Sequence, residues 1–89
     1  MRFDLRMPAA HSLKEKRAVL KPIIEGARTR FRVASAEVDH HQVWQRAAIG
    51  VAAVGATVGH VTEVLDNVER FVWSFPDVEV LEAERSWAV

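Results

Sequence analysis

Apolar and charged residues alternate at the start of the chain. Over residues 2–7, three apolar side chains face one side and three charged ones face the other, which is typical of a strand with one buried face. Ser12 then begins a helix over residues 12–31, because S-x-x-E is a capping box and apolar residues follow it at helical spacing. Pro22 lies inside this helix and predicts a bend. The expected buried stripe is Leu13, Leu20, Ile24, Ala27 and Phe31.

The middle of the chain predicts two strands. Residues 33–38 form a short strand, residues 39–42 a turn, and the long apolar run 43–56 another strand. The Ala-rich part of that run could also be helical, but interspersed Val, Ile and Gly favour a strand. Its small residues indicate close approach of another backbone, or a bulge near Gly50.

The last third predicts a helix and a strand. Thr57 caps a helix over residues 58–74. Pro76 and Asp77 follow this helix, and residues 78–89 form the final strand, with Leu81, Ala83 and Trp87 on one face. The buried stripe of the second helix is Val61, Val64, Leu65, Val68, Phe71 and Val72.

The order of these elements indicates one α+β domain over residues 1–89. Strand–helix–strand–strand–helix–strand is the ferredoxin-like arrangement, a four-stranded antiparallel sheet with both helices on one face. The long run 43–56 is apolar on both sides, so we expect the open face of the sheet to be covered too. The simplest cover is a second copy of the chain. Candidate residues for this homodimer face are Trp44, Arg46 and Trp87.

Composition narrows the class of protein. The chain has no cysteine, which excludes disulfides, thiolate nucleophiles and zinc–cysteine sites and fits a reducing compartment. The first ten residues are not a signal peptide, and no apolar run reaches the roughly 20 residues of a membrane helix. We expect a cytoplasmic protein that does not bind membranes.

The net charge of zero conceals a strong asymmetry. Residues 11–32 carry seven basic and two acidic side chains, whereas residues 57–89 carry seven acidic and two basic ones. Such polarity indicates an acidic partner for the basic segment, or self-association of opposite patches. The competing interpretation is two solvated surfaces that differ in sign.

The segment HSLKEKR at residues 11–17 places cations at the positive end of a helix, where they are disfavoured. At 100° per residue, Lys16 and Arg17 flank the apolar stripe. Their stems could lie along the core edge, with their charges paired to Glu37 or Asp39 or capping strand carbonyls. Alternatively, the helix start and its cations bind phosphate or an RNA backbone. The candidates for anion or RNA binding are Ser12, Lys14, Lys16, Arg17, Lys21, Arg28, Arg30 and Arg32.

No motif indicates catalysis. The chain lacks a Gly-rich phosphate loop, a nucleophile elbow and an H-E-x-x-H sequence. His40 and His41 are adjacent in a turn without a second ligand set at a recognised spacing, so we expect neither a metal nor a cofactor. The aromatic string of RNA-recognition sheets is absent as well. We therefore expect the protein not to be an enzyme.

Three segments together resemble the YlxP-like bacterial family, domain of unknown function 503. They are SLKEKR at 12–17, FRVASAEV at 31–38 and WQRA at 44–47. The chain departs from the family pattern at Arg32, Ala34, His41 and Val43, and its first strand begins late. The resemblance implies a ferredoxin-like fold and no enzymatic activity. Genes of this family often lie beside those for ribosome-binding factor A and translation initiation factors, which implies contact with RNA or the ribosome.

Three hypotheses follow, of which the last is an enzyme or a small-anion sensor that uses the N-terminus of the first helix. The first is a small accessory factor of translation or ribosome maturation whose basic first helix contacts ribosomal RNA or ribosome assembly factors. The second is a non-enzymatic homodimeric scaffold in which the same cations form structural ion pairs with Glu37 and Asp39.

Overall fold

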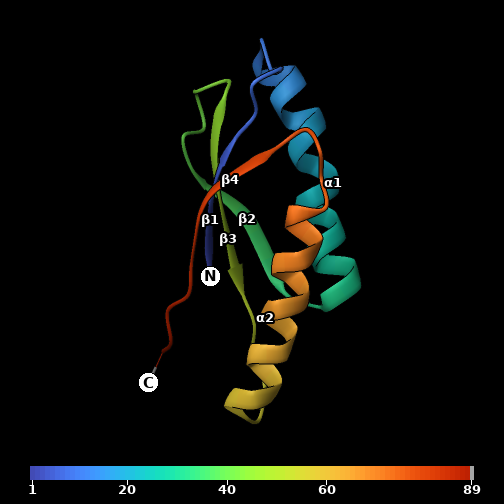
Figure 1. The fold of residues 1–89 in the computed structure, drawn as a ribbon, viewed down its shortest axis with the longest axis vertical. Helices are drawn as coiled ribbons and strands as arrows, with labels where there is room; N and C mark the ends of the chain where they lie inside the picture. Colours follow the sequence, from blue (N-terminus) through green and yellow to red (C-terminus); the bar gives the residue numbers. More distant parts are fainter. Residues whose placement is uncertain (89) are drawn as a thin grey trace.

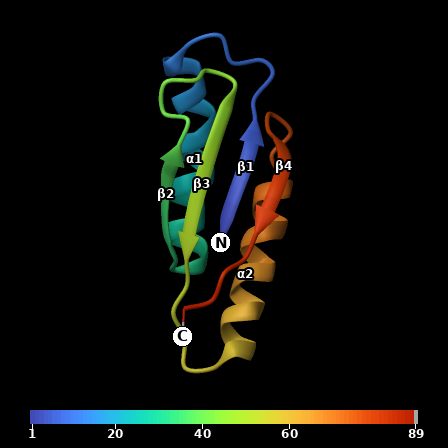
Figure 2. The same ribbon diagram turned by 90° about the vertical axis from the view of Figure 1, so that its left-hand side faces the viewer.

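A computed structural model describes residues 1–88, which form a four-stranded sheet with two helices on one face (Figure 1). The strand order is β2-β3-β1-β4, and each neighbouring pair is antiparallel, which confirms the predicted ferredoxin-like arrangement (Figure 2). In chain order the elements are β1 (Arg2–Arg6), α1 (Leu13–Phe31), β2 (Ala34–Asp39), β3 (Arg46–Ala52), α2 (Val58–Trp73) and β4 (Glu79–Glu84).

Both helices begin where the sequence predicts. The Ser12 hydroxyl accepts a 3.0 Å hydrogen bond from the Glu15 backbone N–H, and the Glu15 carboxylate accepts one from the His11 N–H. This is the expected capping box. Helix α1 continues through Pro22 to Phe31. The Thr57 hydroxyl caps α2 in the same way by accepting from the His60 N–H.

The third and fourth strands are shorter than predicted. Strand β3 covers Arg46–Ala52 in place of 43–56, because its neighbours offer partners only along this stretch, from Arg6 to Arg2 on β1. Residues 43–45 belong to the loop that follows β2. Strand β4 ends at Glu84, so Trp87 lies beyond the sheet, and Val89 lies outside the described residues.

The sequence offered a bulge near Gly50 as one of two alternatives, and the structure has a register shift not at Gly50 itself but on the neighbouring β2, opposite Ile49 and Ala48. Gly50 lies in regular register, opposite Arg2 on one side and Ala36 on the other. The close approach comes from a side chain, because a Cβ on Gly50 would lie 2.9 Å from Cγ1 of Val38. The register shifts occur instead between Glu37 and Asp39 in the β2–β3 pair and beside Asp4 in the β1–β4 pair.

The core lies between the sheet and the helices. All six predicted core residues of α2 pack there, with Leu65, Val68 and Val72 fully buried. The buried stripe of α1 is rotated slightly from the predicted one, because Ile23 is buried and Ile24 only partly so. Near the start of α1, the buried stripe also contains Lys16, which is only 1% exposed although it is charged.

Candidate functional site

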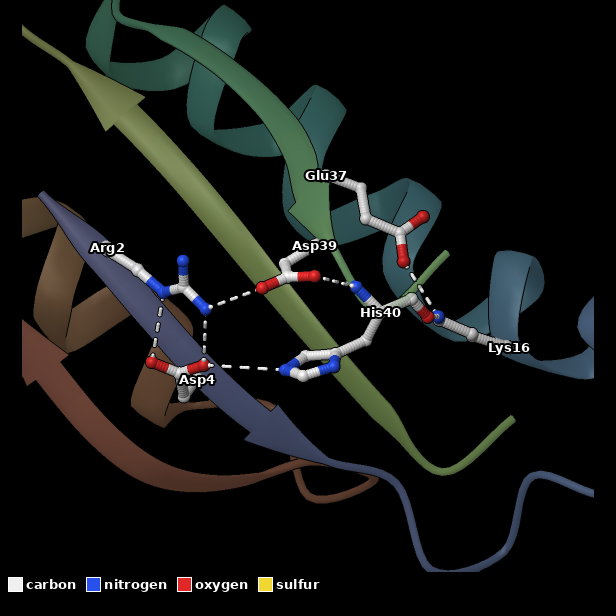
Figure 3. Close-up of polar contacts among 6 residues, drawn as sticks. All are labelled: Arg2, Asp4, Lys16, Glu37, Asp39 and His40. Carbon is white, nitrogen blue, oxygen red and sulfur yellow. Dashed lines mark hydrogen bonds and ion pairs between the residues drawn. The ribbon is translucent and has the colours of Figure 1, made fainter. Parts of the chain in front are cut away.

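Lys16 is a buried anchor for the loop between β2 and β3. Its ammonium donates hydrogen bonds of 2.6 Å to the His40 carbonyl and 2.8 Å to the Val43 carbonyl. Oε2 of Glu37 lies 2.7 Å from the same nitrogen, as an ion pair and not as an aligned hydrogen bond (Figure 3). The ion pair with Glu37 that the sequence offered as one alternative is therefore present. With three protein oxygens around it, this ammonium is committed to the fold.

The start of α1 is also occupied by the protein's own groups. The Ser12 hydroxyl accepts a hydrogen bond from the Glu15 N–H in the first turn, and the Glu15 carboxylate accepts one from the His11 N–H just before the helix. The carboxylate of Glu15 also places a negative charge at this helix end. An anion that binds α1 is therefore stabilised more by the basic side chains further along the helix than by the helix N-terminus.

Four of the candidate cations form one line on the outside of α1, which we call the basic stripe: Lys14, Arg17, Lys21 and Arg28. At 100° and 1.5 Å per residue, they fall within an arc of about 60° and extend over about 21 Å. All four residues are exposed. Within residues 1–88, none of them forms an ion pair, whereas other basic side chains of the protein do.

A shallow groove runs between the basic stripe and β2. The cavity has a volume of about 240 Å³, and its lining combines Arg17, Lys21 and Arg28 with aliphatic and acidic side chains. Its other lining residues are Leu20, Ile24, Glu25 and Glu37. Strand β2 is an edge of the sheet, so the stripe and the groove lie beside an unpaired strand edge.

Arg28 is held in place at this edge. Its Nε and Nη2 both donate to the Ser35 carbonyl, at 3.0 and 2.7 Å. These two bonds fix the guanidinium but leave its other N–H groups free for a ligand. A second side chain, His41, contacts the Glu37 carbonyl at 3.2 Å. The edge of β2 is thus partly covered by side chains of the same chain.

The remaining two candidates, Arg30 and Arg32, lie away from the stripe. The Arg30 guanidinium is 5.1 Å from the ring centroid of Phe71 on α2, so it stacks where the two helices meet. Arg32 ends α1 in the left-handed conformation, with φ of 55°, and its N–H bonds to the Arg28 carbonyl. The structure therefore brings together four of the eight predicted residues.

A polar network that the sequence did not predict crosses the open sheet face. Arg2 donates to both carboxylate oxygens of Asp4, at 3.1 and 3.2 Å, and to Asp39 at 3.2 Å (Figure 3). The His40 ring lies 4.0 Å from Asp4. Ala48, which is opposite both aspartates in the sheet, is fully buried. The only signal in the sequence was the spacing of Arg2 and Asp4, which places both on one face of a strand.

Two pKa values in this network shift as ion pairing predicts. The pKa of Asp39 is lowered, mainly by the hydrogen bond from the His40 backbone N–H and next by the one from Arg2. The pKa of Arg2 is raised by its hydrogen bonds to Asp4 and Asp39. Asp39 is therefore the partner of Arg2, and not of Lys16 or Arg17.

The three candidates for the dimer face do not form one surface. Trp44 is half exposed in the loop before β3, and Arg46 begins that strand. Trp87 lines a groove of about 500 Å³ at the other end of β3, together with residues 51–58, which cover the last two residues of that strand and the segment after it. The loop before β3 and the segment after β4 lie at opposite ends of the molecule (Figure 2).

Neither a metal-binding cluster nor a membrane-spanning helix is found among the described residues. Among residues 1–88, no three histidine, aspartate or glutamate side chains come together in a way that would hold a metal ion. In the same part of the chain, neither helix combines the length and apolar character needed to cross a membrane.

Comparison with known proteins identifies the family. The family model described as "Protein of unknown function (DUF503)" matches residues 1–85. The chain is similar to the "Uncharacterized protein YlxP" of Bacillus subtilis (strain 168), with 38% identity over 78 residues, which cover 88% of this chain and 85% of that protein. The chain therefore belongs to the DUF503 family of proteins of unknown function.

Proposed function

We propose that the protein is a non-enzymatic factor that binds the phosphate backbone of RNA through the basic stripe. The observation that carries this proposal is the line of four exposed cations without ion-pair partners along one side of α1. Elsewhere in residues 1–88, Arg2, Arg6 and Arg85 each pair with carboxylates. Exposed cations that form no ion pair along one side of a helix are suited to an external polyanion.

RNA is the polyanion that we favour. A phosphate backbone presents negative charges in a row, and a row of cations extending over about 21 Å can contact several of them at once. The implied link of the family with translation supports the same ligand class. Lys16 is excluded from this contact surface because its ammonium is buried and bonded.

The test compares two variants with equal changes in net charge. Arg17→Glu combined with Lys21→Glu reverses the centre of the stripe. Arg6→Glu combined with Arg70→Glu reverses two exposed cations on β1 and α2. We expect the stripe variant to lose more than tenfold in affinity for ribosomal RNA fragments at about 100 mM salt, and the control variant to bind nearly as the parent does. Equal losses in both variants, or none in the stripe variant, would contradict the proposal.

A second proposal, of a different class, is a homodimeric interaction domain that pairs through the open sheet face. It is favoured by the half-exposed apolar side chains Val38, Val43 and Trp44 on β2 and the loop that follows it. Analytical ultracentrifugation of the parent protein at micromolar concentration should give the mass of a dimer, and Val38→Glu should give that of a monomer. A monomeric parent protein would exclude this proposal.

A further inference from the structure

We infer that the RNA bound by the basic stripe is double-helical, and that the protein contacts its backbone without reading its bases. This inference rests on the proposed function, because it names the form of RNA that the same surface would take. Three features of the stripe and its surroundings carry it: the absence of aromatic side chains from the groove, the presence of acidic ones, and the fixed spacing of the cationic positions along α1.

The groove beside the stripe offers nothing on which a base can stack. Proteins that bind single-stranded RNA splay its bases onto aromatic side chains, and each stacked base contributes about 1–3 kcal/mol. The side chains that accompany the cations in this groove are aliphatic or acidic. The three tryptophans are half exposed, but none of them lines the groove. A single strand would therefore gain only its phosphate contacts here.

Acidic groups also make the groove unfavourable for a flexible strand. A single strand adapts to a groove and would follow the floor between α1 and β2. Glu25 and Glu37 line that space. Glu37 is paired with Lys16, so the exposed Glu25 is the acidic residue that repels phosphate there. A double helix is convex and stiff, so its phosphates can contact the outward cations of the stripe without entering the groove.

The backbone of α1 fixes the spacing of the four cationic positions, and one of the cations is held in place by the fold. Helix α1 has 19 residues, and the Arg28 guanidinium is pinned by two hydrogen bonds to the Ser35 carbonyl. Because a double helix keeps its phosphates at fixed spacing, cations at fixed positions along a helix can face several of them, and the pinned Arg28 loses little conformational entropy on contact. Recognition by backbone and shape is the usual mode for double-stranded RNA, whose major groove is too narrow for side chains.

The strand edge beside the stripe disfavours the alternative of a peptide. Peptides that extend a sheet need the free carbonyl and N–H groups of an edge strand. On β2, Arg28 donates to the Ser35 carbonyl and His41 contacts the Glu37 carbonyl. A peptide would have to displace both side chains, whereas a phosphate backbone needs neither carbonyl.

The experiment measures fluorescence anisotropy with three labelled probes of about 20 nucleotides. They are an RNA duplex, a duplex of the same composition in scrambled order, and an unstructured polyuridine strand. We expect both duplexes to bind within about threefold of each other and at least tenfold more tightly than polyuridine at equal salt. The Arg17→Glu, Lys21→Glu variant should lose duplex binding, and the Arg6→Glu, Arg70→Glu control should keep it. Circular dichroism shows whether both variants retain the fold.

Binding of the three probes separates double-helical recognition from RNA binding as such. If polyuridine binds as tightly as the duplexes and still depends on the stripe, double-helical recognition is wrong and RNA binding stands. If the two duplexes differ strongly in affinity, base reading is present and the inference is overturned. If no probe depends on the stripe, the proposed function itself fails.

Discussion

Replacing Lys16 with methionine tests whether this lysine belongs to the fold. Methionine keeps an unbranched apolar stem in the same 1% exposed position and removes only the ammonium. That change leaves the His40 and Val43 carbonyls without their donor and the Glu37 carboxylate without its cation. The side chain of Glu37 is 20% exposed, so water can solvate it only in part.

The expected loss follows from these three contacts. Removing one partner of a buried ion pair costs about 3–5 kcal/mol, because the other charge stays buried. Water that solvates the loop carbonyls in place of the ammonium returns about 1 kcal/mol. We therefore expect Lys16→Met to lower the free energy of unfolding by about 3 kcal/mol. With a urea dependence of about 1.5 kcal/mol per molar, the unfolding midpoint falls by about 2 M.

Urea titration followed by far-ultraviolet circular dichroism measures this loss. Lys14→Met is the matched control, because Lys14 lies on the same helix and is exposed. Its midpoint should change by less than about 0.5 M, since surface substitutions usually change stability by about 0.5 kcal/mol or less. Combining Glu37→Gln with Lys16→Met should cost less than the sum of the two single changes. Equal urea midpoints for Lys16→Met and Lys14→Met would show that the buried ammonium of Lys16 does not stabilise the fold.

Two further predictions concern other parts of the fold. The hydrogen bond from the His40 backbone N–H lowers the pKa of Asp39 in the folded protein. The ionised Asp39 therefore contributes its full stabilisation above the unfolded-state pKa of about 3.9. This stabilisation is lost as the pH falls through the lower pKa of the folded state. Below about pH 4, the urea unfolding midpoint of Asp39→Asn should therefore change less with pH than that of the parent protein. If the midpoints of the two proteins changed with pH in parallel, this prediction would be contradicted. Gly26→Ala should destabilise the protein by about 1 kcal/mol, because the new Cβ would lie 2.5 Å from Phe71, whereas Gly59→Ala meets nothing within 4 Å and should stabilise α2 by up to about 1 kcal/mol. Thermal unfolding should show a lower melting temperature than the parent for Gly26→Ala and a higher one for Gly59→Ala. Equal changes in melting temperature would show that the Phe71 ring moves aside freely.

The sequence predicted what depends on local patterns. Both helices and their caps followed from the spacing of apolar residues and from Ser12 and Thr57. The strand order followed from the order of the elements. The length of β3 could not be predicted in this way, because the run 43–56 is apolar throughout and only pairing with β1 and β2 determines where the strand ends.

The sequence alone could not predict which cations of α1 are buried and which are exposed. Lys16 and Arg17 are adjacent and both flank the predicted stripe, yet one is buried against Glu37 and the other faces solvent. The difference depends on where the loop after β2 places its carbonyls, which are 24 and 27 residues away in the sequence. The attachment of Arg28 to Ser35 and the stacking of Arg30 on Phe71 are likewise contacts between different elements.

We propose that the exposed stripe of α1 binds phosphate and that buried Lys16 does not. The most direct test is the slope of log affinity against log salt concentration for an RNA duplex. Each phosphate contact contributes about 0.7–0.9 to this slope, so four cations predict a value near −3. Lys14→Ala, Arg17→Ala and Lys21→Ala should each make the slope shallower by about one contact. A parent slope near zero, or slopes that stay at the parent value in all three variants, would contradict the claim.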